Sequence, residues 1–255
     1  SLAFLYEIRK LGKWCAFIGS AVLMHIFIDA FNNYGVGWFE PFSQQRISFN
    51  SIYVADPFFS IFPGVALLIL LMYKKHNLFR QWVWRLGLLL PALYLMYGLG
   101  NKWYINRETK NILAAENVSY KRMLATPAPL QSWLWYIVIE NDTGYYTTYR
   151  SVLDDKNKIN LHYFAKNEAL SIQAAADAPL TQLKRFSQGW YSFEKRKDTL
   201  LFNDLRFGQV TGWQSPANGF AFYYYLQPEL DNLLVVQRGR FANWDRHTFF
   251  ALLRR

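Results

Sequence analysis

Three nearly uncharged apolar stretches within the first 101 residues constrain what this chain can fold into. They cover residues 14–31, 57–73 and 86–101, and the first contains only His25 and Asp29 as ionisable side chains besides Cys15. Crossing about 30 Å of hydrocarbon takes roughly 17–25 residues, and aromatic side chains flank the stretches as they do at membrane interfaces. Three buried helices of a soluble protein are the alternative, but soluble domains seldom group such runs so closely. The pattern predicts an α-helical membrane domain with about three transmembrane helices.

Charge separates this N-terminal part from the rest of the chain. Residues 1–100 hold 8 of the 28 Lys and Arg and 4 of the 18 Asp and Glu of the 255-residue sequence. Aromatic residues make up 19%, which excludes intrinsic disorder, and the single cysteine excludes a disulfide scaffold. The net charge of +10 comes with no arginine-rich run or interleaved aromatic motif, so we expect no nucleic-acid partner.

Basic residues in the short loops predict the orientation of the helices. They precede the first stretch or lie between the second and the third: Arg9, Lys10 and Lys13, then Lys74, Lys75, Arg80 and Arg85. The positive-inside rule places both groups in the cytoplasm, and residues 32–56 and everything after residue 101 outside it. We therefore expect a multi-pass inner (cytoplasmic) membrane protein with an extracytoplasmic C-terminal domain. Because the chain begins with Ser1 and shows no signal-peptide cleavage site, we also expect an upstream segment.

The second part of the chain changes to strand-like patterns. Residues 102–125 read as a helix stopped by the Thr-Pro-Ala-Pro run at 126–129. Two aromatic, β-rich runs surround an Asn-Asp-Thr-Gly turn, at 133–140 and 145–153, and predict a hairpin. Further strands are expected at 189–194, 199–202, 208–212 and 220–225, and a helix at 166–187.

These patterns divide the chain into three predicted parts. Residues 1–104 form a transmembrane helical domain with a loop at 32–56, and residues 105–129 form a helical linker. Residues 130–255 form a small α+β, mainly antiparallel soluble domain outside the membrane.

His25 and Asp29 are the first candidates for chemistry. They stand four residues apart, so both side chains lie on one face of the predicted helix. Imidazole and carboxylate are ligands that divalent metals accept, and ionisable groups inside a bilayer are costly and tend to mark sites. A polar pair that only hydrogen-bonds is the alternative.

A longer pattern follows this pair. The Asn32-x-Tyr34-Gly35 turn comes first, then a Pro-Phe-Ser-x-x-Arg loop that ends at Arg46, then Asp56-Pro57 at the start of the next helix. Arg46 is expected to pair with Asp56 or with a substrate anion. Residues 25–57 resemble the YdjM/YbcI-like family of membrane-bound, metal-dependent hydrolases. Weaker similarities lie at residues 126–129 and in the Asp-Leu-Arg-Phe-Gly run at 204–208.

The resemblance implies a hydrolase of the inner membrane that acts on an ester or phosphoester of a small-molecule or lipid-linked substrate. His25 and Asp29 would bind a divalent metal ion, zinc or manganese, near membrane lipid. Asp56, as a further ligand or an orienting carboxylate, and Arg46 would be the catalytic residues. Asn32 and Tyr34 would support the ligands or face the substrate.

One feature of the family has no counterpart in this sequence. The family also carries an upstream His-Arg-x-x-Thr-His-Ser motif, whereas a catalytic zinc takes three protein ligands and only His25 and Asp29 match here. The alternative function is a non-catalytic membrane protein whose C-terminal domain binds a partner or an envelope component, with His25 and Asp29 only structural.

Overall fold

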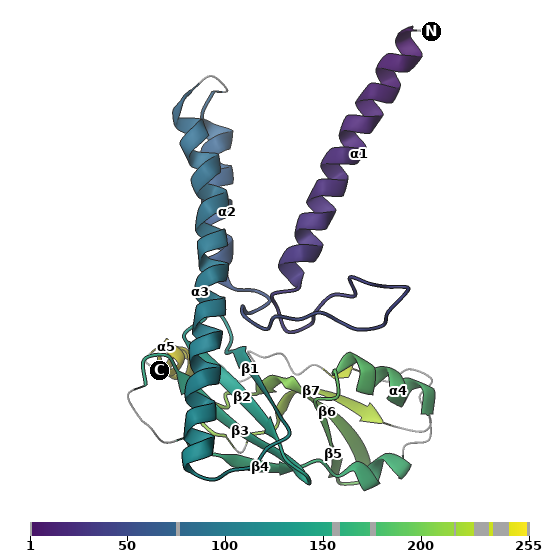
Figure 1. Ribbon diagram of the computed structural model, residues 1–255, viewed down its shortest axis with the longest axis vertical. Coiled ribbons are helices and arrows are strands. Elements are labelled where there is room, and N and C mark those ends of the chain that lie inside the picture. Colours follow the sequence, from purple (N-terminus) through teal and green to yellow (C-terminus); the bar gives the residue numbers. More distant parts are fainter. Residues whose placement is uncertain are drawn as a thin grey trace.

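Three long helices extend from one side of a β-rich domain (Figure 1). The structure, a computed structural model, describes residues 2–74, 77–154, 159–173, 177–216, 218–226, 235–236 and 245–253. The helices are α1 (Leu2–Asp29), α2 (Pro57–Met72) and α3 (Phe79–Ala115). Lys75, one of the residues that predict the orientation, lies outside the described residues.

Within the described residues, two helical segments are long and apolar enough to cross a membrane, Leu11–Asp29 and Phe79–Ala115. The 16-residue α2 is also apolar but is shorter, so three transmembrane helices are not confirmed. Large apolar side chains such as Phe17 and Leu23 are exposed along α1, which is the kind of surface that lipid chains cover.

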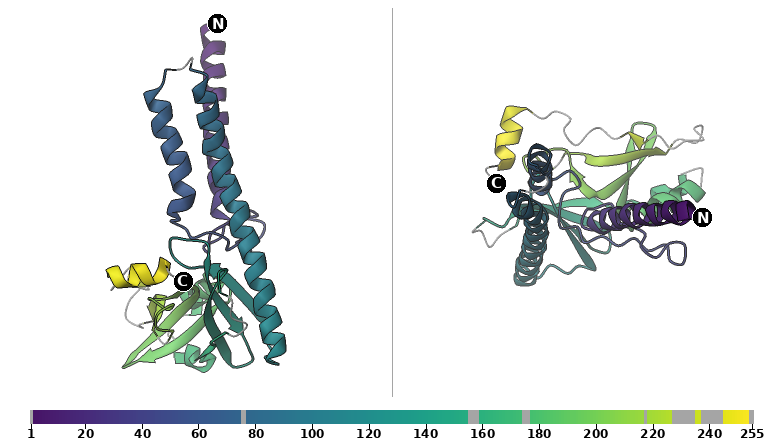
Figure 2. Two further views of the ribbon diagram at one scale, coloured as in Figure 1. Left: turned by 90° about the vertical axis from the view of Figure 1, so that its left-hand side faces the viewer. Right: turned by 90° about the horizontal axis from the view of Figure 1, so that it is seen from above.

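Helices α2 and α3 pack together as a hairpin (Figure 2), and α1 leans away from this hairpin (Figure 1). Asp56 caps the N-terminus of α2 and Pro57 occupies its first turn, where a proline costs no hydrogen bond. The two helices approach closely at Gly87, because a Cβ there would lie 2.5 Å from the Cβ of Ala66. Small residues at such crossings let helix backbones come together.

Helix α3 is longer than α2. Its first part packs on α2 in the apolar hairpin, and its second part runs along the side of the β domain (Figure 1). It ends at Ala115, and Asn117 follows in the left-handed conformation that asparagine tolerates after a helix. Residues Arg122–Pro127 form strand β1, so the predicted helical linker is wrong in its second half. Pairing with β2 buries Leu124 and Ala125 there and overrides the local helical pattern.

In the part of the domain that the structure describes, the strands form two antiparallel four-stranded sheets, in agreement with the predicted antiparallel α+β class. The first has the order β1 (Arg122–Pro127), β2 (Leu134–Glu140), β3 (Gly144–Ser151) and β4 (His162–Ala165). The second has the order β5 (Tyr191–Arg196), β6 (Thr199–Gln209), β7 (Phe220–Leu226) and β8 (Val235–Val236).

The predicted hairpin is confirmed as β2 and β3, and Asn141 organises its turn by accepting hydrogen bonds from the backbone of Thr143 (3.1 Å) and Gly144 (2.7 Å). The strand expected at 199–202 extends to Gln209 in β6, because pairing with β7 resumes at Gln209 after an irregularity between Asp204 and Gln209. The strand expected at 208–212 is therefore correct only at its start, since residues 210–212 form a turn. The helix expected at 166–187 is divided into the 3₁₀ helix η1 (Glu168–Gln173) and α4 (Asp177–Phe186). A last helix, α5, covers Arg246–Leu253.

The domain has four layers, in the order α3, first sheet, second sheet and α4. Ile105 and Leu113 of α3 pack against Trp135 on one face of β2. The other face of β2 packs through Tyr136 against Leu205 of the second sheet. A third cluster joins α4 to the outer face of the second sheet, through Leu180, Leu183, Phe193 and Phe202.

Candidate functional site

His25 and Asp29 lie together on the last turns of α1, as their spacing predicts. His25 Nε2 is 3.3 Å from Asp29 Oδ2, and the two side chains are 76% and 44% exposed. The amide of Asn32 lies 3.4 Å from the other carboxylate oxygen of Asp29. The geometry confirms that both side chains share one helix face; their predicted role as metal ligands stays a prediction.

Asp56 is 2% exposed and lies where α2, α3 and the start of β2 meet. Its Oδ1 accepts hydrogen bonds from the backbone N–H groups of Phe58 (2.9 Å) and Phe59 (3.4 Å). Its Oδ2 accepts hydrogen bonds from the hydroxyls of Tyr94 on α3 (2.8 Å) and Ser132 (3.3 Å). Both oxygens are therefore occupied by groups that hold three elements together.

Burial raises the pKa of the Asp56 carboxyl above its ordinary value, and the four hydrogen bonds oppose that shift. The same donors stabilise the charged form, so the carboxylate acts as a helix cap and an inter-element link in this geometry.

The signature loop, residues 32–56, is held by Arg46. Arg46 Nε and Nη2 donate hydrogen bonds to the backbone carbonyls of Tyr34 (3.1 Å) and Gly35 (2.7 Å). Gly35 has a φ of +68°, and a Cβ there would lie 2.8 Å from the carbonyl oxygen of Ile47. The glycine and the arginine thus fix the same turn, and the predicted pairing of Arg46 with Asp56 is not formed.

Asn32 and Tyr34 shape the start of the loop. The Asn32 side chain accepts a hydrogen bond from the backbone N–H of Tyr34 at 2.8 Å, which forms an Asx turn. The Tyr34 ring packs against Phe207 of β6, with 4.8 Å between ring centroids, and against Phe222 of β7. Tyr34 therefore docks the loop on the second sheet.

The residue between them, Asn33, forms a buried junction that the sequence did not predict. Its Nδ2 donates to the carbonyl of Arg206 (3.2 Å), and its Oδ1 accepts from the hydroxyl of Thr126 (2.5 Å). Arg206 Nη1 donates in return to the carbonyl of Asn33 at 3.2 Å. We call Asn33, Thr126 and Arg206 the Asn33 junction; it ties the end of α1 to strands of both sheets.

Arg206 is itself fixed by a buried ion pair. Its Nε and Nη2 contact the two carboxylate oxygens of Asp204 at 3.0 and 2.6 Å, and the side chains are 1% and 0% exposed. The guanidinium also lies 4.8 Å from the Phe186 ring centroid and 5.1 Å from that of Phe207. A bidentate, fully buried pair holds its geometry firmly, because freeing either charge would leave the other unpaired.

Two short motifs far apart in the chain therefore meet the signature loop. Thr126 belongs to the Thr-Pro-Ala-Pro run, and Asp204 and Arg206 belong to the Asp-Leu-Arg-Phe-Gly run. Both runs are weak similarities to the YdjM/YbcI-like family, so the sequence does contain a signal for residues of the Asn33 junction. Tyr94 and Ser132, the partners of Asp56, carried no such signal.

The described residues do not complete a metal centre. No three His, Cys, Asp or Glu side chains among them come together, whereas a catalytic zinc takes three protein ligands. His25 and Asp29 supply two donors, and Asp56 is occupied in the cap of α2. A zinc centre with three protein ligands would need at least one donor in addition to this pair.

The fold and this site define a class of protein: a helical region with two helices of membrane-spanning length, connected through the buried Asn33 junction to an antiparallel two-sheet domain. Residues 1–104 match a family model described as YdjM inner membrane protein, which confirms the resemblance found in the sequence. The matched region contains α1, α2, the whole signature loop and the part of α3 that ends at Tyr104. No curated protein and no solved structure gives a significant match to the chain.

Proposed function

We propose that the protein is a multi-pass inner membrane enzyme that hydrolyses an ester or phosphoester of a small-molecule or lipid-linked substrate. His25 and Asp29 serve as two ligands of a divalent metal ion, zinc or manganese. The contact between these two side chains, 3.3 Å apart at the end of an apolar helix, carries the proposal. The family match over residues 1–104 supports the membrane location.

The position of the domain relative to the membrane is part of this proposal. The loop between α2 and α3 and the β domain lie at opposite ends of the helical hairpin (Figure 2). Lys74, Arg80 and Arg85 lie at the loop end, which the positive-inside rule assigns to the cytoplasm. The domain and the His25–Asp29 pair are then extracytoplasmic.

Hydrolysis by the full-length protein in lipid vesicles tests the enzymatic proposal. Chromogenic carboxyl ester and phosphodiester substrates are offered to the wild type and to Asp29→Ala, with and without a chelator. We expect turnover by the wild type that the chelator and Asp29→Ala both abolish. Asp142→Ala, a change of the same kind at a surface residue paired with Lys121, is the control and keeps its activity. Turnover that survives Asp29→Ala contradicts the proposal.

A second candidate is a non-catalytic membrane protein whose C-terminal domain binds an envelope component. The observation that favours it is that Asp56, Arg46 and Tyr34, all predicted to serve a reaction, are engaged in contacts that hold the fold. This function predicts full-length protein without hydrolytic activity that sediments with cell-envelope material. His25→Ala would leave that sedimentation unchanged. A His25→Ala protein that no longer sediments with the envelope material would contradict this candidate.

A further inference from the structure

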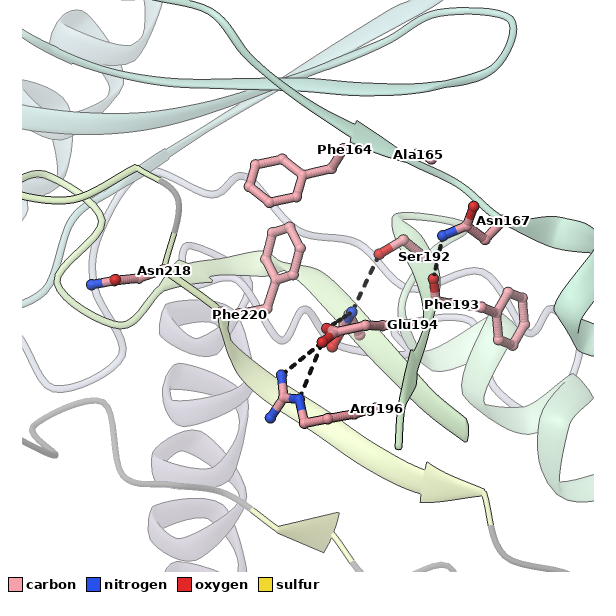
Figure 3. A pocket seen from close by; sticks show the side chains of 11 residues that line it. Phe164, Ala165, Asn167, Ser192, Phe193, Glu194, Arg196, Asn218 and Phe220 are labelled. Atoms are coloured by element: carbon pink, nitrogen blue, oxygen red, sulfur yellow. Dashed lines mark hydrogen bonds and ion pairs between the residues drawn. The ribbon is translucent and has the colours of Figure 1, made fainter. Parts of the chain in front are cut away.

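A pocket of about 330 Å3 opens between the two sheets, and the residues that line it come from these sheets and the segments next to them, not from the signature loop. Figure 3 shows its side chains. Its walls come from β4, β5 and β6 and from the residues that lead into β7. Ser192, Glu194 and Arg196 alternate along β5 and so share one face of the strand, and Asn203 is the register partner of Ser192 on β6. The outer face of the same strands is covered by α4, so this polar face is a separate surface.

The floor of the pocket is polar and buried. Ser192 is 3% exposed and Asn203 is 2% exposed. The Asn203 amide reaches Ser192 Oγ at 3.5 Å and Glu194 Oε2 at 3.4 Å, which is longer than the usual distance of about 2.9–3.0 Å. Buried polar groups with such long contacts gain free energy from a ligand that offers better-placed hydroxyls.

Two phenylalanine rings form the wall above this floor (Figure 3). Phe164 of β4 and Phe220 of β7 stand with ring centroids 5.0 Å apart and with an interplanar angle of 61°. Aromatic rings next to mixed donors and acceptors match a sugar ring, which carries C–H groups on its faces and hydroxyls around its edge.

The charges of the pocket disfavour an ionic ligand. Its lining contains one cation and one anion, and Arg196 donates to Glu194 Oε1 through Nε (3.1 Å) and Nη2 (2.9 Å). A phosphate that reached the guanidinium would lie beside the Glu194 carboxylate, and the two negative charges would repel each other. An uncharged polyhydroxyl ligand leaves the pair in place.

The strand edge beside the pocket disfavours a peptide. A peptide is captured mainly through the free N–H and C=O groups of an edge strand. On β5, the N–H of Phe193 already donates to the carbonyl of Lys166 at 3.0 Å, and its carbonyl accepts from Asn167 Nδ2 at 2.9 Å.

We propose that this pocket binds an uncharged saccharide ring, either as a free sugar or as part of a cell-envelope glycan. Ser192 and Asn203 bind its hydroxyls, and Phe164 and Phe220 pack against its face. The volume is near the lower end of the range for small-molecule pockets, which suits one or two rings. The proposal is independent of the hydrolase proposal, and it names a ligand class for the second candidate function.

Ligand binding to the full-length protein in detergent tests it. Glucose and N-acetylglucosamine are the probes, glycylglycine and inorganic phosphate are the comparison ligands, and saturation-transfer NMR is the readout. We expect the sugars to bind and the comparison ligands not to bind. Asn203→Leu should weaken binding about tenfold, because it removes the amide from the floor.

Two further variants separate loss of binding from loss of folding. Gly219 lines the pocket, and a Cβ on it would meet only Arg196 Nη2 at 3.6 Å, so Gly219→Leu adds a bulky side chain to the lining without a backbone clash at its Cβ. It should abolish binding while the thermal unfolding midpoint stays near that of the wild type. Gln182→Leu makes the same amide-to-leucine change as Asn203→Leu on the exposed face of α4 and should bind sugars normally.

Sedimentation with insoluble cell-envelope glycan distinguishes the two sources of the ligand. Binding of free sugars that Gly219→Leu abolishes supports the proposal with a soluble ligand. Retention on the glycan alone, also abolished by Gly219→Leu, supports it with a polymeric ligand. Failure of both, equal binding of glycylglycine or phosphate, or binding unchanged in Gly219→Leu overturns it.

Discussion

At Asp56 a buried carboxylate is surrounded by four hydrogen-bond donors, and its ionisation is therefore coupled to folding. Burial raises the pKa of this carboxyl in the folded protein above the ordinary value of about 3.9. Between the ordinary pKa and the raised pKa of the folded protein, Asp56 is protonated to a greater extent in the folded state than in the unfolded state. The contribution of Asp56 to the free energy of unfolding consequently falls as the pH rises through this range, and it is constant above the folded-state pKa.

Asp56→Asn should remove this dependence, because an amide does not titrate. We expect the free energy of unfolding of the wild type, relative to the variant, to decrease as the pH rises from about 4 and then to level off. Thermal unfolding of both proteins between acidic and neutral pH measures it. A wild-type advantage that grows with pH would mean that the hydrogen bonds outweigh burial.

Arg46→Lys separates the two roles considered for Arg46. A lysine cannot donate to the carbonyls of Tyr34 and Gly35 in the forked geometry of a guanidinium. Loss of one such hydrogen bond costs about 1 kcal/mol, and we expect the unfolding midpoint to drop by about 2–4 °C. An unchanged midpoint together with a large loss of hydrolysis would instead assign Arg46 to substrate binding.

Helix α3 and the signature loop can approach closely because α3 has a glycine, Gly98, at the point of contact. A Cβ on Gly98 would lie 2.6 Å from the backbone carbonyl oxygen of Ser51, and that oxygen has no flexible end that could move away. Phe31, Ile52 and Leu95 form the apolar cluster around this approach. The end of α1, the loop and α3 are therefore packed as one unit.

Gly98→Ala should destabilise this unit by about 1–3 kcal/mol, because overpacking forces the loop or the helix to shift. Gly100 lies on the same helix with nothing within 4 Å of its Cβ position, so Gly100→Ala is the matched control. It should be neutral or raise stability by up to about 1 kcal/mol through helix propensity. Similar unfolding midpoints for the two variants would show that the loop does not pack on α3 this closely.

For the whole molecule, the elements that could be predicted from sequence are those with a local pattern. The apolar helices, the β2–β3 hairpin and the contact between His25 and Asp29 all follow from periodicity or short spacing. The Asn33 junction joins residues 173 positions apart through a side chain and a carbonyl, a pairing that has no periodic signal. Strand β1 could not be predicted for a related reason, because its pairing with β2 overrides its local pattern.

The orientation of the whole molecule in the membrane can be tested at its C-terminus. If the hairpin crosses the membrane, the positive-inside rule predicts that the loop with Lys74 and Arg80 is cytoplasmic and that the β domain lies on the other side. An alkaline phosphatase fused after Arg255, which folds only outside the cytoplasm, should be active, and green fluorescent protein fused there should be dark. The reverse pattern would contradict the orientation.

The metal content of the full-length protein, purified from membranes and measured by mass spectrometry, tests the proposed metal-dependent function most directly. We predict about one zinc or manganese ion per chain in the wild type, and its loss in both His25→Ala and Asp29→Ala. His162→Ala, which removes an imidazole from β4 outside the proposed site, is the control and should keep the metal. Wild-type protein without a divalent metal, or metal that is retained when His25 and Asp29 are replaced, would contradict the account.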